Sequence, residues 1–385
     1  MNPKYVVLGA GLQGVAAAYD FGRFGQAGGT ILADAQETAA GAGAEKLNQL
    51  LGRDLVTSAR VDVRDSGRVQ ALLQEADVCL SAVPYYFNVE LTKIAIAAGC
   101  HLCDLGGNTG VVFKQHEMHA AAVAAAISIA PDCGLAPGMA NILAAHGIRK
   151  LEQPKEVHIC VGGLPQHPQP PLGYHLCFNI EGLTNEYFGK AQILRRGKVT
   201  EVDTFTGLEE IEFPDPIGKC EAFMTAGGTS TCPWTFEGIL EEYDEKTIRY
   251  PGHYEKMKTV HELGLLDLKA VQVQGQQVVP RQLFHAVVEP MLETDDPRDV
   301  VLLRVIVSGG KEKMVMELID TYDETTGFTA MQRTTGFGAA IVGIMLAQGQ
   351  VPPGTIRIER DIDTEAYVQE MAKRGFALKI DLTHA

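Results

Sequence analysis

The sequence predicts an α/β protein in which a doubly wound parallel sheet is followed by a second α+β domain, built on a mixed, largely antiparallel sheet. Strand and helix patterns alternate over the first 130 residues, which is typical of a parallel sheet with helices on both faces. After about residue 150 the pattern changes to alternating strands joined by hairpin turns. The length of 385 residues also favours two domains over a single hydrophobic core.

The strands of the first domain are predicted from short apolar runs, which are typical of strands buried on both faces of a sheet. These runs cover residues 4–9, 29–34, 78–83 and 100–105, and "ISIAPDCGL" at 127–135 begins as one more strand. The helices between them are predicted near residues 12–24, 37–50, 66–75 and 88–98. We therefore place the first domain at residues 1–130.

The second domain, placed at residues 131–332, is predicted from segments whose apolar side chains alternate. Val157, Ile159 and Val161 of "EVHICVGG" lie on one face of a strand. The segment "GYHLCFNIEG" at 173–182 is a further strand candidate. Two hairpins follow, and they turn at Arg196-Gly197 and at Ser308-Gly309-Gly310.

The segment "RTTGFGAAIVGIMLAQG" at 333–349 predicts a long apolar helix rich in small residues. Because it lacks the polar face of a surface helix, we expect it to pack back on the first domain. Residues 350–385 are assigned to a C-terminal segment.

Composition and charge exclude several classes of protein. The chain is 46% hydrophobic and 21% charged, as in an ordinary globular protein, and its net charge is −15. Nucleic-acid binding needs clusters of Lys and Arg, and the sequence contains none, so no nucleic-acid partner is expected. No apolar run approaches the roughly 20 residues of a membrane span, and no signal-peptide pattern opens the chain. We expect a cytoplasmic protein without a membrane partner.

The cysteine and histidine patterns do not predict a metal site. Cys100 and Cys103 form a single CxxC, but they fall in a predicted strand, which points the two thiols to opposite faces. His116 and His119 have the i, i+3 spacing of metal ligands, but no third ligand is near them in sequence.

A glycine pattern near the N-terminus predicts a dinucleotide site of the Rossmann type. Gly9-Ala10-Gly11-Leu12-Gln13-Gly14 fits GxGxxG, follows a predicted strand and opens a predicted helix. Gly9 permits the tight turn, Gly11 lets the backbone approach a pyrophosphate, and Gly14 lets the helix pack closely on the strand. The alternative is a plain glycine turn between a strand and a helix.

Asp34 lies twenty residues beyond Gly14, at the end of the second predicted strand, where a carboxylate accepts hydrogen bonds from the adenosine ribose. The next three residues include no Arg or Lys to hold a 2′-phosphate, so we expect NAD rather than NADP. Ser81, Ala82, Val83 and Pro84 end another strand on the expected path of the cofactor. Tyr85 follows them and either overlooks the nicotinamide or caps the core.

Several sequence blocks resemble a known family. "GAGLQG", "SAVPYYFN", "DLGG" at 104–107 and "PDCGLAPGMANILA" at 131–144 are similar to the saccharopine dehydrogenase/reductase and lysine 6-dehydrogenase family. "NEYFGKAQILRRGK", "EAFMTAGGTST", "IRYPGHYEKM" and the apolar helix resemble its lysine 6-dehydrogenase branch. The similarity extends in order over nearly the whole chain.

The resemblance implies a Rossmann domain, a catalytic and oligomerisation domain, and hydride transfer at a carbon that bears an amine. For the lysine branch it implies the conversion of L-lysine, NAD⁺ and water to allysine, ammonia and NADH. Allysine then cyclises to a piperideine carboxylate. It also implies a homo-oligomer, most simply a homodimer. The complete set of cofactor candidates is Gly9, Gly11, Leu12, Gln13, Gly14, Asp34, Ser81, Ala82, Val83, Pro84, Asp104 and Leu135.

Oxidation of an amine needs a proton acceptor, because hydride leaves only from a carbon whose nitrogen carries a free lone pair. His253 in "RYPGH" is our candidate base or proton relay, since histidine titrates near neutral pH; the alternative is a structural loop histidine. The further catalytic candidates are Glu221, Asp132 and Tyr85. Glu221 is either a counter-ion for the substrate ammonium or an ordinary surface glutamate.

The amino-acid end of the substrate needs a cation for its carboxylate and acceptors for its amine. Arg249 either holds the carboxylate or pairs with a neighbouring acid. The full set of substrate candidates is Arg249, Tyr250, Thr225, Ser230, Thr231, Asn185 and Glu186.

Two alternatives to a lysine 6-dehydrogenase stay open. A saccharopine dehydrogenase needs a second dicarboxylate pocket with further basic residues, and the catalytic half contains candidates for them. A non-catalytic NAD-sensing module needs no reacting groups, and the polar blocks at 221–231 and 249–253 argue against it.

Overall fold

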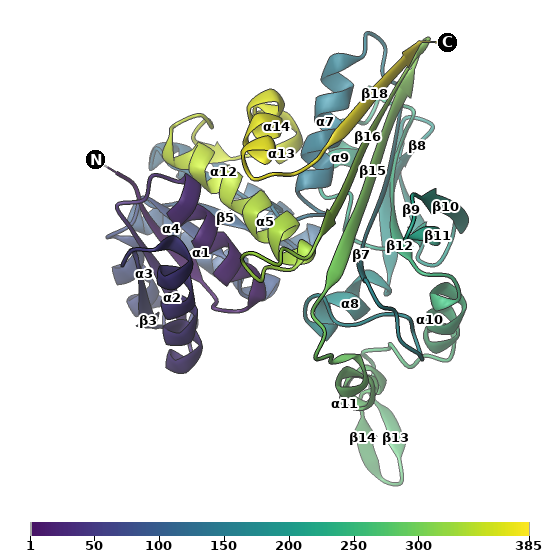
Figure 1. Ribbon diagram of the computed structural model, residues 1–385, viewed down its shortest axis with the longest axis horizontal. Helices are drawn as coiled ribbons and strands as arrows, with labels where there is room; N and C mark the ends of the chain where they lie inside the picture. Colours follow the sequence, from purple (N-terminus) through teal and green to yellow (C-terminus); the bar gives the residue numbers. More distant parts are fainter. Residues whose placement is uncertain (1, 385) are drawn as a thin grey trace.

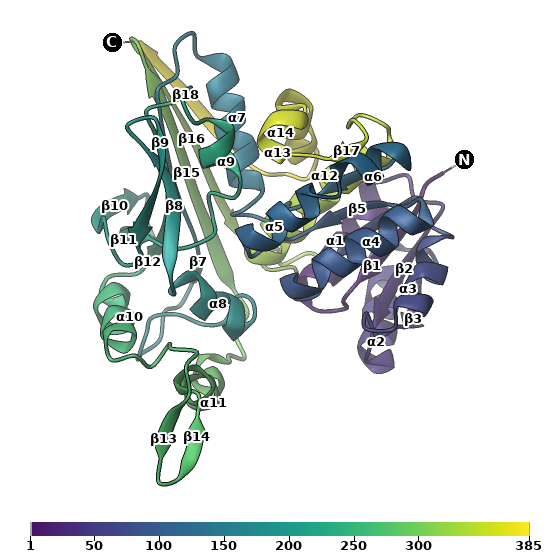
Figure 2. The same cartoon turned by 180° about the vertical axis from the view of Figure 1, so that it is seen from behind.

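The computed structural model describes residues 2–384 and confirms the predicted fold class (Figures 1 and 2). The parallel sheet of the first domain has the strand order β17-β6-β5-β4-β1-β2-β3. Up to residue 130 the elements are β1 (Lys4–Leu8), α1 (Leu12–Phe24), β2 (Gly29–Asp34), α2 (Glu37–Leu51), β3 (Val56–Arg60), α3 (Ser66–Leu73), β4 (Val78–Ser81), the 3₁₀ turn η1 (Tyr85–Phe87), α4 (Asn88–Ala98), β5 (His101–Asp104), α5 (Thr109–His116), α6 (His119–Ala124) and β6 (Ser128–Ala130).

Strand β3 was not predicted, because it lies at the edge of the sheet and most of its side chains are exposed. An edge strand of this kind lacks the continuous apolar run of a central parallel strand. The strand pairs with β2, and this places Arg60 beside Asp34.

The second domain is built on a mixed, largely antiparallel sheet. Its order is β10-β11-β12-β7-β15-β16-β18, and the hairpin β8–β9 pairs with β12. The elements are α7 (Met139–Lys150), β7 (Glu156–Pro165), α8 (Ile180–Glu186), β8 (Lys190–Arg195), β9 (Lys198–Asp203), β10 (Glu209–Phe213), β11 (Gly218–Met224), α9 (Cys232–Thr235), β12 (Glu242–Arg249), α10 (His253–Glu262), β13 (Val271–Val273), β14 (Gln276–Val278), α11 (Pro280–Leu292), β15 (Asp299–Gly309) and β16 (Glu312–Thr321).

The two predicted hairpins form, as β8–β9 and β15–β16. The strand predicted at 173–182 was wrong. Residues 173–179 form a loop, and Asn179 caps α8 by accepting a hydrogen bond from the Gly182 amide at 2.7 Å. Tyr174, Leu176 and Phe178 pack into the apolar cluster beneath this loop, so their alternation reflects loop burial rather than strand pairing.

After β16 the chain returns to the first domain. The π-helical turn η2 (Gln332–Phe337) continues into α12 (Gly338–Ala347), which packs against α1, β4 and β5. The remaining elements are β17 (Gly354–Thr355), α13 (Ile358–Asp361), α14 (Thr364–Lys373) and β18 (Lys379–His384). β17 joins the parallel sheet beside β6, and β18 joins the second sheet beside β16. The described part of the C-terminal segment, residues 350–384, therefore contributes to both sheets (Figure 1).

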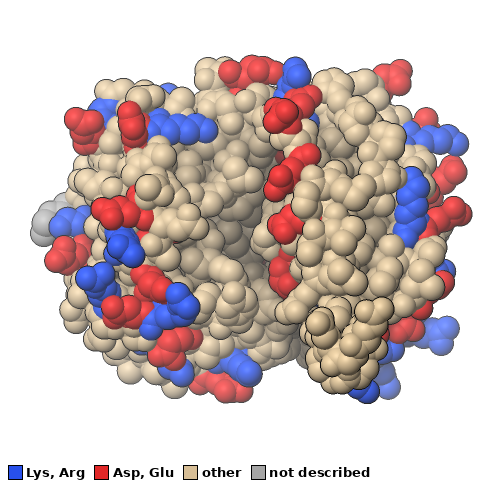
Figure 3. Space-filling view, turned by 90° about the horizontal axis from the view of Figure 1, so that it is seen from below, with Lys and Arg blue, Asp and Glu red and all other residues tan. Residues whose placement is uncertain are grey.

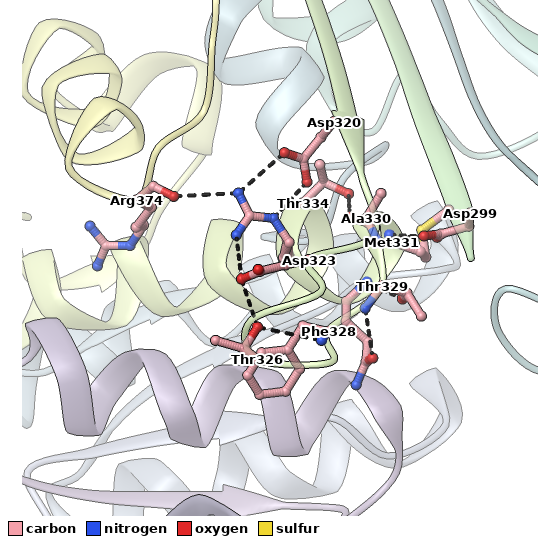
Figure 4. Close-up of polar contacts among 12 residues, drawn as sticks. Asp299, Asp320, Asp323, Thr326, Phe328, Thr329, Ala330, Met331, Thr334 and Arg374 are labelled. Carbon is pink, nitrogen blue, oxygen red and sulfur yellow. Dashed lines mark hydrogen bonds and ion pairs between the residues drawn. The ribbon is translucent and has the colours of Figure 1, made fainter. Parts of the chain in front are cut away.

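Buried ionic groups hold this return segment in place (Figure 4). Asp299, at the start of β15, accepts hydrogen bonds from the backbone amides of Ala330 and Met331 at 2.6 and 2.8 Å. Arg333 donates to Asp320 at 2.8 Å. These contacts connect the end of the second sheet to the apolar helix that covers the first, and so they set how the two domains face each other.

Candidate active site between the domains

A cavity of about 580 Å³ lies between the two domains. Its first wall is formed by loops at the carboxyl ends of β1, β4 and β5, and its second wall by β7, α8, β12 and the loop after β11. The space-filling view shows the hollow between the two halves, with acidic side chains along one rim (Figure 3). Ligands of open α/β sheets bind at this end of the strands.

The glycine turn has the geometry of a pyrophosphate site. Gly9 has φ +104°, which favours glycine, and a Cβ on Gly14 would lie 1.8 Å from the Gly9 carbonyl oxygen. A Cβ on Gly11 would meet nothing within 4 Å, and no side chain caps the α1 N-terminus at Gly11. The free amides and the positive end of the helix dipole therefore face open space, which fits a dinucleotide phosphate.

The Asp34 carboxylate is held beside this turn. It accepts hydrogen bonds from the backbone amides of Ala10 and Gln36, both at 2.8 Å. Arg60 is its neighbour in β3, a basic residue that the sequence pattern around Asp34 did not reveal. The residues present fit the adenosine end of a nicotinamide dinucleotide.

The other cofactor candidates divide into lining residues and supporting residues. Leu12, Gln13, Ala82, Val83, Pro84, Tyr85 and Leu135 line the cavity. Ser81 and Asp104 are buried behind the wall. Ser81 donates to the Asn88 side chain, and Asp104 accepts from the Gly106 and Asp132 amides and from Gln115. Asp104 therefore shapes the loop of the wall.

Asp132 is also buried behind this wall, and its φ of +59° is one that Asp tolerates better than most residues. Its Oδ2 accepts a hydrogen bond from Ser230, whereas Oδ1 lacks a partner among residues 2–384. Burial, together with the charge of Asp104, raises the pKa of Asp132 to about 7.

The second wall carries polar side chains at alternate positions of β12. Glu245, Thr247 and Arg249 face the cavity, and the Thr247 hydroxyl lies 2.7 Å from that of Thr225. Glu245 was missed from the sequence. The available signal was the run Glu245, Thr247, Arg249, since alternate residues share one face of a strand. Three polar residues on a buried face indicate a site.

Arg249 is held in a buried network. Its Nε donates to the Tyr187 hydroxyl at 2.8 Å, one Nη donates to the Ile248 carbonyl, and the other contacts Glu186 at 3.3 Å. Burial raises the pKa of Glu186 to about 7 despite the guanidinium. Asn185 donates to the Gly107 carbonyl at 3.1 Å and thereby joins the two walls.

His253 does not line the cavity. Its Nε2 lies 2.9 Å from the Tyr187 hydroxyl and its Nδ1 lies 3.1 Å from the Leu172 carbonyl, so both ring nitrogens are occupied. Burial and the Arg249 guanidinium lower the pKa of His253 to about 3. A direct role as base does not fit this position, because the ring contacts Tyr187, and in the series His253–Tyr187–Arg249 only Arg249 lines the cavity.

Several other candidates lie outside the cavity. Glu221 accepts hydrogen bonds from the Gly252 and Tyr254 amides at the start of α10. Tyr250 donates to the Pro165 carbonyl, and Thr231 donates to Glu359. These side chains stabilise the second domain, and of the substrate candidates Arg249, Thr225, Asn185 and Glu186 line the cavity.

The charges of the cavity wall are unbalanced. Of the described residues that line it, the acidic ones are Glu181, Glu186, Glu245 and Glu289, and the single basic one is Arg249. Arg249 is already engaged by Glu186. The cavity therefore favours a ligand with net positive charge.

Comparisons with known proteins cover both domains. The family model for the saccharopine dehydrogenase NADP binding domain matches residues 5–129, and the model for the saccharopine dehydrogenase C-terminal domain matches residues 134–376. The chain belongs to the saccharopine dehydrogenase family. Its first domain is the nicotinamide-dinucleotide-binding domain of that family.

Curated relatives of this saccharopine dehydrogenase family member are about one quarter identical to it over the aligned residues. Saccharopine dehydrogenase [NADP(+), L-glutamate-forming] of Schizosaccharomyces pombe is 24% identical over 262 residues, which cover 66% of this chain and 57% of that protein. Mitochondrial alpha-aminoadipic semialdehyde synthase of Rattus norvegicus is 24% identical over 382 residues, covering 80% of this chain and 40% of that protein. The chain thus spans about half the length of these relatives.

A solved structure shares the fold of this family member. Apo saccharopine dehydrogenase (L-Glu forming) of Saccharomyces cerevisiae matches with a TM-score of 0.77 at 20% identity, over 99% of this chain and 100% of that chain. In residues 2–384, no helix is long and apolar enough to cross a membrane, and no group of three or more His, Cys, Asp or Glu is placed to hold a metal ion.

Proposed function

We propose that the protein is an oxidoreductase that catalyses NAD-dependent oxidative deamination of the ε-amino group of L-lysine. The products are allysine, which cyclises to piperideine-6-carboxylate, ammonia and NADH. Membership of the saccharopine dehydrogenase family supports a nicotinamide-dependent reaction at an amine of an amino acid. The choice of lysine rests on the cavity between the domains.

The observation that carries the proposal is the charge of the cavity. Lysine at neutral pH has two ammonium groups and one carboxylate, whereas saccharopine has three carboxylates. Burial raises the pKa of two of the four cavity glutamates, Glu186 and Glu245; a nearby ammonium group favours their charged forms, and a nearby carboxylate disfavours them. The wall therefore suits the first charge pattern better than the second. The basic residues that a second dicarboxylate pocket requires do not line the described cavity.

In the proposed complex, Arg249 binds the substrate carboxylate and the glutamates bind its ammonium groups. Arg249 is positioned by Tyr187, and Tyr187 is in turn positioned by His253, so His253 acts through other residues rather than on the substrate. A bound nicotinamide dinucleotide supplies the hydride acceptor. Glu186, whose pKa lies near 7, is the cavity carboxylate best matched to accept a proton at neutral pH.

We propose that the cofactor is NAD because of the position of Asp34, although the relatives' names specify NADP. A carboxylate at the end of β2 binds ribose hydroxyls and repels a 2′-phosphate. Replacing Asp34 with alanine should raise kcat/KM with NADP⁺ relative to NAD⁺ by about tenfold or more, which is about 1.4 kcal/mol. The ratio is measured by steady-state kinetics with both cofactors. An unchanged ratio would remove Asp34 from cofactor selection.

The experiment that tests the reaction mixes the full chain and NAD⁺ separately with L-lysine, L-saccharopine, L-ornithine and a diamine at alkaline pH. NADH formation is followed by absorbance, and ammonia and glutamate are assayed. NADH with ammonia from lysine is expected. NADH with glutamate from saccharopine would replace the proposal with a saccharopine dehydrogenase, the activity that the curated relatives' names favour. Dinucleotide binding without turnover would favour an NAD-sensing module.

We also propose a homo-oligomer, as a dimer or larger assembly, in the cytoplasm. The support for an assembly is the projecting arm formed by residues 263–291, in which β13 and β14 pair with each other (Figure 2). Eight of its large apolar side chains are exposed, which is typical of an interface: Leu263, Leu265, Leu268, Val271, Val273, Leu283, Val287 and Met291. Light scattering coupled to size exclusion tests the assembly, because a monomer would contradict it.

A further inference from the structure

Glu245 occupies an unusual position in the cavity wall. It is 3% exposed, it lines the cavity from the middle of β12, and its Oε2 has no hydrogen-bond partner among the described residues. A Cβ on Gly228 would come within 2.3 Å of this oxygen, so the glycine leaves the carboxylate the space it needs. A buried carboxylate of this kind costs folding free energy unless a cation reaches it.

The protein itself does not supply that cation. The Arg249 guanidinium directs its hydrogen bonds to Tyr187, the Ile248 carbonyl and Glu186, and among the described residues it forms no ion pair with Glu245. Burial and then the like charge of Glu186 raise the pKa of Glu245 well above its usual range. The Thr225 hydroxyl, which lies 2.7 Å from that of Thr247, lowers the pKa of Glu245 by hydrogen bonding, but a hydroxyl supplies no positive charge.

We propose that Glu245 determines specificity for an amine substrate, because its free carboxylate oxygen pairs with an ammonium group of the bound substrate. This inference rests on the proposed function. The pair forms in a desolvated wall, where a charge-assisted hydrogen bond is strong. A substrate whose corresponding group is neutral or anionic leaves the carboxylate unpaired and binds less well. Glu245 thereby provides the attraction for a cation that distinguishes lysine from substrates rich in carboxylates.

The test is the Glu245→Gln variant of the full chain, which removes the charge and keeps the shape. Binding is measured by calorimetry in the presence of NADH for three probes: L-lysine, 6-hydroxy-L-norleucine, which lacks the ε-amine, and 6-aminohexanoate, which lacks the α-amine. The variant should bind L-lysine about 30-fold more weakly or worse, the cost of losing one partner of a buried pair. One of the two analogues should lose less than about threefold, and that analogue identifies the ammonium that Glu245 binds.

The matched control is Glu241→Gln, the same substitution at an exposed glutamate near the start of β12, where it pairs with Lys155 on the surface. It should leave all three affinities within about twofold, since exposed ion pairs contribute little. Glu245→Asp, which keeps the charge and shortens the side chain, should fall between wild type and Glu245→Gln. NADH affinity and melting temperature verify that each variant is folded.

Two results overturn the inference alone. In the first, the wild type binds L-lysine and Glu245→Gln binds it equally well. In the second, Glu245→Gln weakens the binding of all three probes equally, which indicates that Glu245 shapes the cavity and does not pair with an ammonium group. A wild-type chain that does not bind L-lysine overturns the proposed function and this inference with it. These results separate the failure of the specificity residue from the failure of the substrate assignment.

Discussion

Replacing Arg374 with methionine should lower the free energy of unfolding by about 3–5 kcal/mol at pH 8. The Arg374 and Asp20 side chains are both 0% exposed, and the guanidinium contacts the Asp20 carboxylate through two hydrogen bonds, at 2.6 and 2.7 Å. The pair joins the end of α14 to α1. Methionine fills much of the space but leaves the Asp20 charge without a partner. Urea unfolding at pH 8 measures the loss.

The same variant should lose less stability at acid pH. Burial raises the pKa of Asp20 to about 6 even beside Arg374, and loss of the cation raises it further, so an unpaired Asp20 takes up a proton on folding. The double variant Asp20→Asn, Arg374→Met should recover part of the stability at pH 8, because no buried charge is left. If the single and double variants are equally unstable, the loss comes from the contacts of Arg374 with Phe24 and Glu370 rather than from the Asp20 charge.

The second large effect is a pH dependence set by Asp132. Its pKa is about 7 in the folded protein against an ordinary value of 3.8, so between these values the folded state holds a proton that the unfolded state releases. The contribution to stability is therefore fully present below pH 4 and is lost as the pH rises through 7. A shift of about three units corresponds to about 4 kcal/mol.

Asp132→Asn should remove this dependence, and asparagine suits the φ of +59°. Relative to the variant, the wild-type free energy of unfolding should fall by as much as about 4 kcal/mol between pH 4 and pH 8. Urea unfolding of both proteins over this range gives the difference, in which the titration of all other groups cancels. Asp54→Asn, at an exposed position, is the control. Parallel curves for wild type and Asp132→Asn would show that Asp132 stays ionised.

Both predictions concern the walls of the candidate site. Asp132 lies behind the loop that includes Gly106, since a Cβ on Gly106 would come within 2.1 Å of its Oδ1. Arg374 fixes α14 to α1, the helix whose N-terminus faces the cavity. Both groups therefore support elements that form the first wall of the cavity, the loop with Gly106 and helix α1.

The cofactor half of the site was predictable because its residues are close together in sequence. Gly9, Gly11 and Gly14 follow one strand and begin one helix, and the backbone requirements of that turn are local. Asp34 was predictable because the carboxyl ends of neighbouring parallel strands meet at one edge of the sheet. Arg60 was not, because β3 is an exposed edge strand without an apolar run.

The substrate half was predictable only in part. The blocks around Arg249 and Asn185 were identified, but within them the sequence does not show which side chain points into the cavity. His253 is four residues from Arg249 and has the chemistry of a base, yet it begins α10 and faces Tyr187. Glu245 is also four residues from Arg249, on the same face of β12, and it faces the cavity.

The sequence by itself determined the parallel sheet, the dinucleotide turn, the hairpins and the acidic character of the chain, because these depend on local periodicity, glycine conformation and composition. Only the tertiary structure decided that β12 faces the first domain across a cavity, that β17 completes the parallel sheet, and that four glutamates line the cavity. Those features depend on pairing between residues far apart in the chain. Whether a side chain of a strand points into the cavity depends on which face of the sheet the other domain covers. No local sequence pattern specifies which face is covered.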